Sequence, residues 1–314
     1  MRGSGNRSER FLRRSGDHIL CIEVYVSSYS SVHQSVGRNV GFGQNRGVSL
    51  GYRSTLLRVA RACVLVFAAL ILLGVADAAF GQTRELHVAA AADLTPVMPV
   101  LATEYEKATG VKLVVSLASS ATLEQQIENG APFDVFLSAD FIHPEQLVAA
   151  GKTIEKAPVP YATGLLVLWA RKDSPAQPLS LDSLTKPTVT KVAVANALHA
   201  PYGVAAMRAL TALNMMDAVK SKLVIAENIA QTAQFAESGN AQVGLISLTI
   251  ASSQHYQAVG SFVRVREDLY PEIHQCGVVI KGTKRQVDAV AFLTWLTSAS
   301  VQARLETMGL GKAQ

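Results

Sequence analysis

Residues 122–140 of the chain read TLEQQIENGAPFDVFLSAD. The first eight residues predict a helix over 122–129 that ends at Gly130, because glycine is the preferred residue just past a helix end. A β-rich run over 134–137 follows after Pro132, and this run predicts a buried strand. The stretch is therefore one helix-to-strand unit, and it points to an α/β protein.

The same alternation extends in both directions from this stretch. Strands are predicted at 86–91, 111–117, 134–137, 165–170, 192–195, 243–246, 262–265 and 277–280. Helices are predicted at 94–109, 122–129, 144–150, 202–213, 229–238, 286–298 and 301–308. Alternating strands and helices imply mostly parallel sheets with helices on both faces. About 230 residues of this kind fit one large or two smaller α/β lobes.

The net charge of +5 belongs to the beginning of the chain. Residues 1–81 hold ten arginines, no lysine and four acidic residues, whereas residues 82–314 hold 19 basic and 20 acidic residues. A nucleic-acid-binding surface would need its positive charge on the folded part. The charge distribution therefore excludes nucleic acid as a partner.

An export signal is predicted over residues 51–81. Arg53, Arg58 and Arg61 precede an apolar run over 62–76, and small residues follow it. The run has 15 residues, whereas a membrane span needs about 20 apolar residues, so we expect a cleaved signal peptide, with an uncleaved anchor as the alternative. The mature protein then begins at Ala79 or Gln82 in the periplasm. Residues 1–50 are a leader from a start codon placed too far upstream, or a disordered segment.

Four strand-to-helix turns share one composition, and they lie at 89–95, 117–123, 199–203 and 226–231. Each consists largely of small and polar residues, opens a predicted helix and contains no lysine or arginine. The unpaired N–H groups and the dipole of a helix N-terminus attract anions. For any single turn, ordinary helix capping is the simpler interpretation. Several such turns converging on one cleft could hold a dianion without a cationic side chain.

At these turns the chain resembles the molybdate-binding proteins of bacterial ABC transporters, which have the type II periplasmic binding protein fold. The motifs that carry the resemblance are 90–95 (AAADLT), 118–123 (ASSATL), 126–140 (QIENGAPFDVFLSAD), 199–203 (HAPYG) and 227–234 (ENIAQTAQ). It extends over residues 86–308. It implies two α/β lobes, each a mostly parallel sheet flanked by helices, with the ligand in the cleft between them. Lobe 1 would comprise 82–162 and 272–314, lobe 2 would comprise 163–271, and the chain would cross near 161–164 and 266–273.

The resemblance also implies a set of ligand contacts. Carried over position by position, they fall on Asp93, Ser120, Tyr202, Ile229 and Ser247. Ser120 matches the family's serine, and Ile229 would act through its backbone N–H. Asp93 and Ser247 depart from the pattern, because many members have serine and tyrosine at these two positions.

A carboxylate that faced a dianion would repel it strongly. We therefore expect Asp93 to cap its own helix by accepting a hydrogen bond from the N–H of Thr95, which would turn the carboxylate away from the ligand. The alternative is a carboxylate that faces the cleft, which would favour a protonated anion such as phosphate over molybdate.

Three functions remain open, and the first is a receptor that delivers molybdate or tungstate to a membrane permease. Sulfate, phosphate or a phosphonate are the alternative ligands. This receptor would need no cofactor and no metal beyond the oxyanion, and we expect it to be a monomer.

The second function is an enzyme, but no Gly-x-Ser-x-Gly, His-Glu-x-x-His or Cys-x-x-Cys motif is present. Cys276 lies in an apolar run, which favours a buried core thiol. The third is the sensing domain of a transcription regulator, which would need a DNA-binding motif where the export segment lies. We therefore predict a receptor and no enzyme.

Overall fold

The computed structural model describes residues 84–313. The leader predicted at 1–50 and the signal peptide predicted at 51–81 lie outside this range. Within it, no helix is long and apolar enough to cross a membrane.

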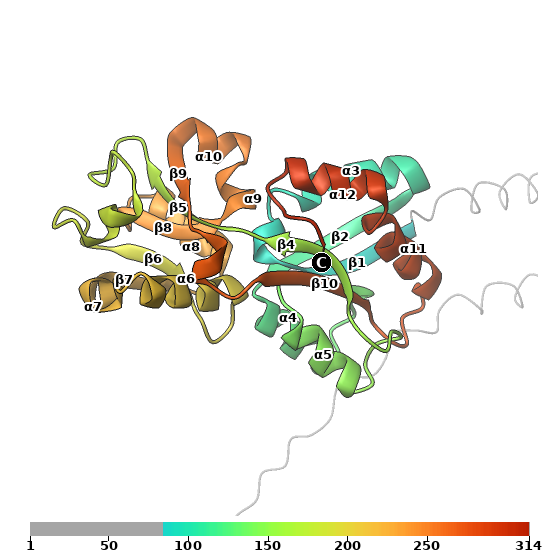
Figure 1. Cartoon of the computed structure of the whole chain (residues 1–314). Coiled ribbons are helices and arrows are strands. Elements are labelled where there is room, and N and C mark those ends of the chain that lie inside the picture. Colours follow the sequence, from blue (N-terminus) through green and yellow to red (C-terminus); the bar gives the residue numbers. More distant parts are fainter. Residues whose placement is uncertain (1–83, 314) are drawn as a thin grey trace, which may run out of the picture. The chain divides into compact units, whose positions relative to one another are not determined.

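The first lobe contains a five-stranded sheet with the strand order β2-β1-β3-β10-β4 (Figure 1). Its strands are β1 (Arg84–Ala91), β2 (Val111–Ala118), β3 (Val135–Ser138), β4 (Val159–Gly164) and β10 (Ile273–Val279). β1 pairs in parallel with β2 and β3, while β10 pairs antiparallel with β3 and β4. The sheet is mixed, whereas the sequence predicted a mostly parallel one. The reason is that β10 brings the chain back from the second lobe and so begins at the edge where its neighbours end.

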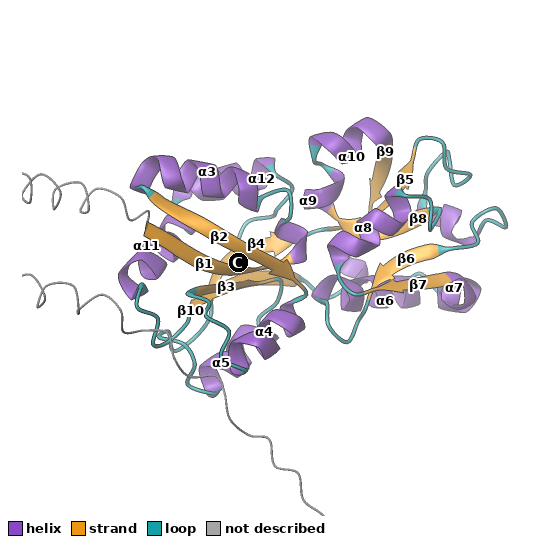
Figure 2. Ribbon diagram, turned by 180° about the vertical axis from the view of Figure 1, so that it is seen from behind, coloured by secondary structure: helices purple, strands orange, loops and turns teal. Residues whose placement is uncertain are grey.

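Helices cover both faces of this sheet (Figure 2). They are α3 (Met98–Thr109), α4 (Ser120–Glu128), α5 (Ile142–Ala149), α11 (Gln286–Leu296) and α12 (Ala299–Thr307). Leu86 and Val88 pack with α3, α11 and α12, while Ala89 and Phe136 pack with α4 and α5. Successive strand residues face opposite sides. Because both sides are covered, the strands are apolar throughout.

The second lobe repeats this plan with the strand order β7-β6-β8-β5-β9. Its strands are β5 (Leu166–Arg171), β6 (Val192–Ala195), β7 (Leu223–Ala226), β8 (Val243–Ser247) and β9 (Gly260–Arg264). Its helices are α6 (Pro201–Ala212), α7 (Met216–Val219), α8 (Ile229–Glu237), α9 (Leu248–Ala251) and α10 (Gln254–Val259), with 3-10 helices η2 (Leu181–Thr185) and η3 (Lys220–Lys222). Here β5 runs against its neighbours, because it enters the sheet from the side of the first lobe.

Two connections join the lobes. The first leads from the end of β4 at Gly164 to the start of β5 at Leu166. The second leads from β9 through η4 (Glu267–Leu269) to β10. A further 3-10 helix, η1 (Ala92–Leu94), follows β1 and contacts α8 and α9 of the second lobe. The carboxyl ends of β1, β2, β3, β6, β7 and β8 therefore lead into turns between the two lobes.

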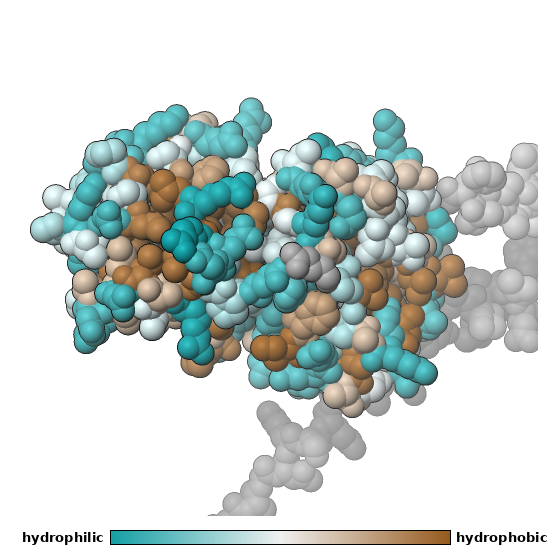
Figure 3. Space-filling model, in the orientation of Figure 1, coloured by the Kyte–Doolittle hydropathy of each residue, from teal (hydrophilic) through white to brown (hydrophobic). Residues whose placement is uncertain are grey.

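Figure 3 shows hydrophilic and hydrophobic residues interspersed on the surface of both lobes. Among the described residues, the most exposed large apolar side chains are Leu198 and Val287, each 84% exposed. They lie far apart in sequence, in a loop of lobe 2 and in α11. Single exposed apolar residues are ordinary on protein surfaces, so they indicate no docking site.

Candidate functional site

All four of the strand-to-helix turns line one small cavity between the lobes. Its walls are Ala91, Ala92, Asp93, Ser119, Ser120, Ala139, Ala200, Pro201, Tyr202, Asn228 and Ile229. The cavity has a volume of about 10 Å³. Drug-sized ligands occupy pockets of about 300–1,000 Å³, so this cavity suits only a small ligand. No lysine, arginine or histidine lines it.

Three helices begin at the cavity, namely α4 at Ser120, α6 at Pro201 and α8 at Ile229. The first N–H groups of a helix have no partner within the helix. At α8 the side chain of Asn228 accepts from the N–H of Gln231 at 3.0 Å, which leaves the N–H of Ile229 at the very start of the helix. The cavity thus combines backbone donors with the positive ends of three helix dipoles.

Ser120 is 1% exposed, and its hydroxyl lies in this cavity. The Oγ atom accepts a hydrogen bond from the N–H of Ala139 at 3.1 Å. Ala139 follows β3, so this bond ties the second turn to the end of the neighbouring strand. The hydroxyl hydrogen of Ser120 stays available to a ligand.

Asp93 also lines the cavity, but the predicted helix cap is wrong. The N–H of Thr95 donates to the carbonyl oxygen of Ala92 at 3.2 Å, not to the Asp93 side chain. The turn after β1 forms η1 with Ala91 at its N-cap, which places Asp93 inside the helix and not at its cap. Its carboxylate points instead to the second lobe, where Oδ2 accepts from the hydroxyl of Tyr202 at 3.2 Å.

Gln275 completes this cluster, and no sequence motif pointed to it. Its Nε2 donates to Oδ2 of Asp93 at 2.5 Å and lies 3.4 Å from the Tyr202 hydroxyl. It is completely buried in β10. The only sequence signal was a single amide side chain directly before the apolar run 276–280.

Burial has a strong effect on Asp93, which is completely shielded from solvent. Desolvation raises the pKa of its carboxyl group to about 7, and the hydrogen bonds from Gln275 and Tyr202 limit the rise. The group therefore exchanges its proton near neutral pH.

Ser247, by contrast, does not line the cavity. It is buried at the N-cap of α9, where its Oγ accepts from the N–H of Ile250 at 3.4 Å. It also shares a hydrogen bond of 2.8 Å with the hydroxyl of Thr249, which donates to the carbonyl oxygen of Asp93 at 2.7 Å. Of the five residues that the family resemblance implied as ligand contacts, four line the cavity. Ser247 does not line it and is linked to Asp93 through Thr249.

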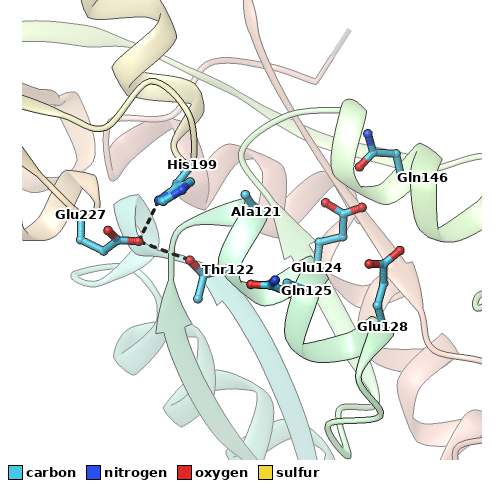
Figure 4. A pocket seen from close by; sticks show the side chains of 8 residues that line it. All are labelled: Ala121, Thr122, Glu124, Gln125, Glu128, Gln146, His199 and Glu227. Carbon is cyan, nitrogen blue, oxygen red and sulfur yellow. Dashed lines mark hydrogen bonds and ion pairs between the residues drawn. The ribbon is translucent and has the colours of Figure 1, made fainter.

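A larger, open pocket lies beside α4 (Figure 4). Three carboxylates line it, those of Glu124, Glu128 and Glu227, and His199 is its only basic group. His199 and Thr122, which belong to different lobes, both contact Oε1 of Glu227, at 3.1 and 3.5 Å. The negative charge makes this pocket unsuitable for an anion. The small cavity has a single carboxyl group in its wall, that of Asp93, and is the better candidate.

Residues 84–313 contain no group of three or more His, Cys, Asp or Glu side chains that could hold a metal ion. Cys276 is buried, as predicted, and its Sγ donates to the carbonyl oxygen of Asp140 at 3.0 Å. Burial raises the pKa of this thiol far above its usual range, which makes it a poor nucleophile.

Residues 86–311 match the family model for bacterial extracellular solute-binding protein. The chain belongs to this family. Among solute-binding proteins, it is 36% identical to the molybdate-binding protein ModA of Azotobacter vinelandii over 234 residues, which cover 73% of this chain and 91% of that protein. It is 33% identical to ModA of Rhodobacter capsulatus over 212 residues, or 68% of this chain and 82% of that protein.

Solved structures of solute-binding proteins give the same result. The periplasmic molybdate-binding protein of Azotobacter vinelandii superimposes with a TM-score of 0.67 at 30% identity, over 73% of this chain and 100% of that one. The resemblance noted in the sequence and the two-lobe α/β fold are therefore confirmed.

Proposed function

We propose that this protein is the periplasmic receptor of an ABC importer, and that it captures molybdate or tungstate in the cavity between its lobes and delivers the anion to a membrane permease. Its relatives named molybdate-binding proteins support the choice of ligand. The ligand contacts are Asp93, Ser120, Tyr202 and the backbone N–H of Ile229. Ser247 acts on Asp93 through Thr249.

One observation carries the proposal. Four turns from both lobes enclose a single small cavity, and their donors are hydroxyl and backbone N–H groups without any cationic side chain. Such a site suits a small anion of high symmetry, because neutral donors can surround it on all sides. Ester or peptide substrates would require a larger pocket and a nucleophile, which this cavity does not provide.

Phosphate, sulfate or a phosphonate is the second candidate ligand, and the observation that favours phosphate is the carboxyl group of Asp93 in the wall. Phosphate carries a proton at neutral pH, and this proton could be donated to a carboxylate. Molybdate and sulfate carry none, so they require the carboxyl group itself to be protonated.

Calorimetric titration of the purified protein with molybdate, tungstate, sulfate and phosphate tests the proposal. We expect molybdate and tungstate to bind at a one-to-one ratio and more tightly than the other two anions. Tighter binding of sulfate or phosphate, or no binding of any anion, would overturn the assignment. Incubation of the protein with candidate esters distinguishes a receptor from an enzyme, because a receptor releases no product.

The periplasmic location rests on the export segment predicted at 51–81. N-terminal sequencing of the protein from the periplasmic fraction should give a first residue at Ala79 or Gln82. Retention in the membrane after a high-salt wash would contradict this location.

A further inference from the structure

The two oxygens of the Asp93 carboxyl group have different surroundings. Oδ2 accepts two hydrogen bonds, from the Tyr202 hydroxyl at 3.2 Å and from Nε2 of Gln275 at 2.5 Å. Oδ1 is buried and has no hydrogen-bond partner among the described residues. Asp93 lines the cavity together with Ser120 and Ile229, so this oxygen belongs to a side chain in the wall that would meet a ligand.

No positive charge compensates this buried carboxyl group. Among residues 84–313, no lysine, arginine or histidine forms an ion pair with it. A buried carboxylate without a cation is costly, and the neutral form is favoured.

The elements packed around Asp93 bring no other charge to it. The titratable neighbours are the phenols of Tyr202 on α6 and Tyr161 on β4, and burial raises the pKa of both above the usual range, so they are neutral. Helix α9 has no ionisable residue. The ionisable residues of α8 and β2 are engaged elsewhere, since Glu237 bonds His255 and Lys112 pairs with Glu85.

The hydrogen bonds also determine where the proton of the neutral form resides. Oδ2 already accepts from two donors, so the proton must lie on Oδ1. In that form Oδ1 is a donor in the wall of the cavity. The Tyr202 hydroxyl has one hydrogen, and Asp93 accepts it. Tyr202 therefore lines the cavity and holds Asp93 in position, while Asp93 donates to the anion.

We propose that Asp93 makes anion binding proton-coupled: a bound oxyanion and Oδ1 of Asp93 share one proton, so the receptor takes up one proton when it binds an anion that carries none. This inference rests on the proposed function. The step forms one O–H bond on the carboxylate, takes the proton from solvent and breaks no bond in the anion. Hydrogen phosphate would supply the proton itself, so its binding would involve no uptake.

The coupling predicts a pH dependence. When the lobes separate, water reaches the carboxyl group and its pKa returns toward the ordinary value of about 3.9. Free receptor is then ionised from about pH 6 to pH 8. In the closed receptor the negative charge of the bound anion raises the pKa of the carboxyl group further above the value of about 7 that burial gives it, so each binding event consumes close to one proton. By linkage, the Kd for molybdate rises about tenfold for each pH unit over this range.

Calorimetry of the whole protein with molybdate between about pH 6 and pH 8, in buffers with different ionisation enthalpies, measures both quantities. We expect uptake of about one proton per anion and the tenfold change of Kd per pH unit. Asp93→Asn is the decisive variant. Its amide oxygen replaces Oδ2 as the acceptor for Tyr202 and Gln275, and its NH₂ group replaces the protonated Oδ1 as a donor. This variant should bind molybdate with a Kd independent of pH and without proton uptake.

His143→Gln is the matched control. His143 lies between Asp140 and Glu124 outside the cavity. Burial lowers the pKa of its imidazole, but hydrogen bonding and attraction to these two carboxylates outweigh burial and raise the pKa above its ordinary value. It should keep the wild-type pH dependence. A Kd of the wild type that is independent of pH, without proton uptake, or an Asp93→Asn variant that keeps the pH dependence, would overturn the coupling while leaving the receptor intact. Absence of binding of any oxyanion at any pH would overturn the proposed function as well.

Discussion

At the scale of single residues, Ser120 is the side chain on which binding should depend most. Its hydroxyl is buried in the cavity and accepts from the N–H of Ala139. A hydrogen bond to a charged group contributes about 1.5–3 kcal/mol. Ser120→Ala should therefore weaken molybdate binding by about ten- to a hundredfold in calorimetric titration.

Ser116→Ala provides the control for this variant, because Ser116 is exposed on the same strand-to-helix segment. We expect it to bind as the wild type does. Wild-type affinity in Ser120→Ala, with an unchanged circular dichroism spectrum, would remove Ser120 from the site.

Gly164 is a second residue with a defined role, because it lies against the Tyr202 side chain. A Cβ atom at this position would stand 2.5 Å from the Tyr202 hydroxyl oxygen and 2.8 Å from Cγ2 of Ile273. Gly164→Ala should displace the tyrosine from Asp93 and weaken anion binding about fivefold, because Asp93 loses a hydrogen bond worth about 1 kcal/mol that holds it in position.

A double-mutant cycle with Tyr202→Phe tests this explanation. Once the hydroxyl is gone, the added methyl group has more room, so Gly164→Ala should cost less in that background. Fully additive effects on Kd would show that the two residues do not act through one contact.

At the scale of elements, Asp134 explains the motif at residues 126–140. It is 2% exposed and stands at the start of β3, at the end opposite to Ala139. Its side chain accepts from the N–H of His87 on β1 at 2.7 Å, from the Thr283 hydroxyl, and from Arg285 at 3.5 Å. The aspartate therefore fastens β3 to β1 and to the segment before α11.

Asp134→Ala should lower the free energy of unfolding by about 2–4 kcal/mol, because it leaves a buried N–H group without a partner. Chemical denaturation measures this, and the anion affinity of the folded fraction should not change. Asp182→Ala, at an exposed position of η2, should have little effect. A change in affinity with unchanged stability would place Asp134 at the ligand site instead.

The strands and helices with a clear pattern could be predicted, and two edge strands could not. The predicted strand 192–195 agrees with β6 at both ends. The edge strands β2 and β9 were predicted, whereas the edge strands β4 and β7 were missed. β4 contains Pro160 and small residues, and the apolar run of β7 has only four residues, which does not distinguish a strand from a piece of helix.

The four turns were found from their composition, since small and polar residues at helix starts are a local signal. The Asp93 contact could not be found in this way. It depends on Tyr202 and Gln275, which lie 109 and 182 residues away in the sequence. The fold of the first lobe brings Gln275 to Asp93, and the packing of the second lobe against the first brings Tyr202 to both.

At the scale of the whole molecule, the contacts across the cleft imply a clamp. Asp93 of the first lobe bonds Tyr202 of the second, and the N–H of Ala121 donates to the carbonyl oxygen of His199 at 3.3 Å. A ligand that contacts both lobes favours the arrangement in which all contacts form. Small-angle scattering should therefore show a smaller radius of gyration when molybdate is added. Unchanged scattering at saturating molybdate would contradict a clamp.

The central claim is that a cavity with neutral donors selects molybdate, and metal analysis after equilibrium dialysis tests it most directly. The protein is dialysed against a low concentration of molybdate with an excess of sulfate and phosphate of about a thousandfold, and its molybdenum content is measured by mass spectrometry. The account predicts about one molybdenum per chain in wild type and a marked loss in Ser120→Ala. Displacement of molybdenum from the wild type by sulfate or phosphate would contradict it.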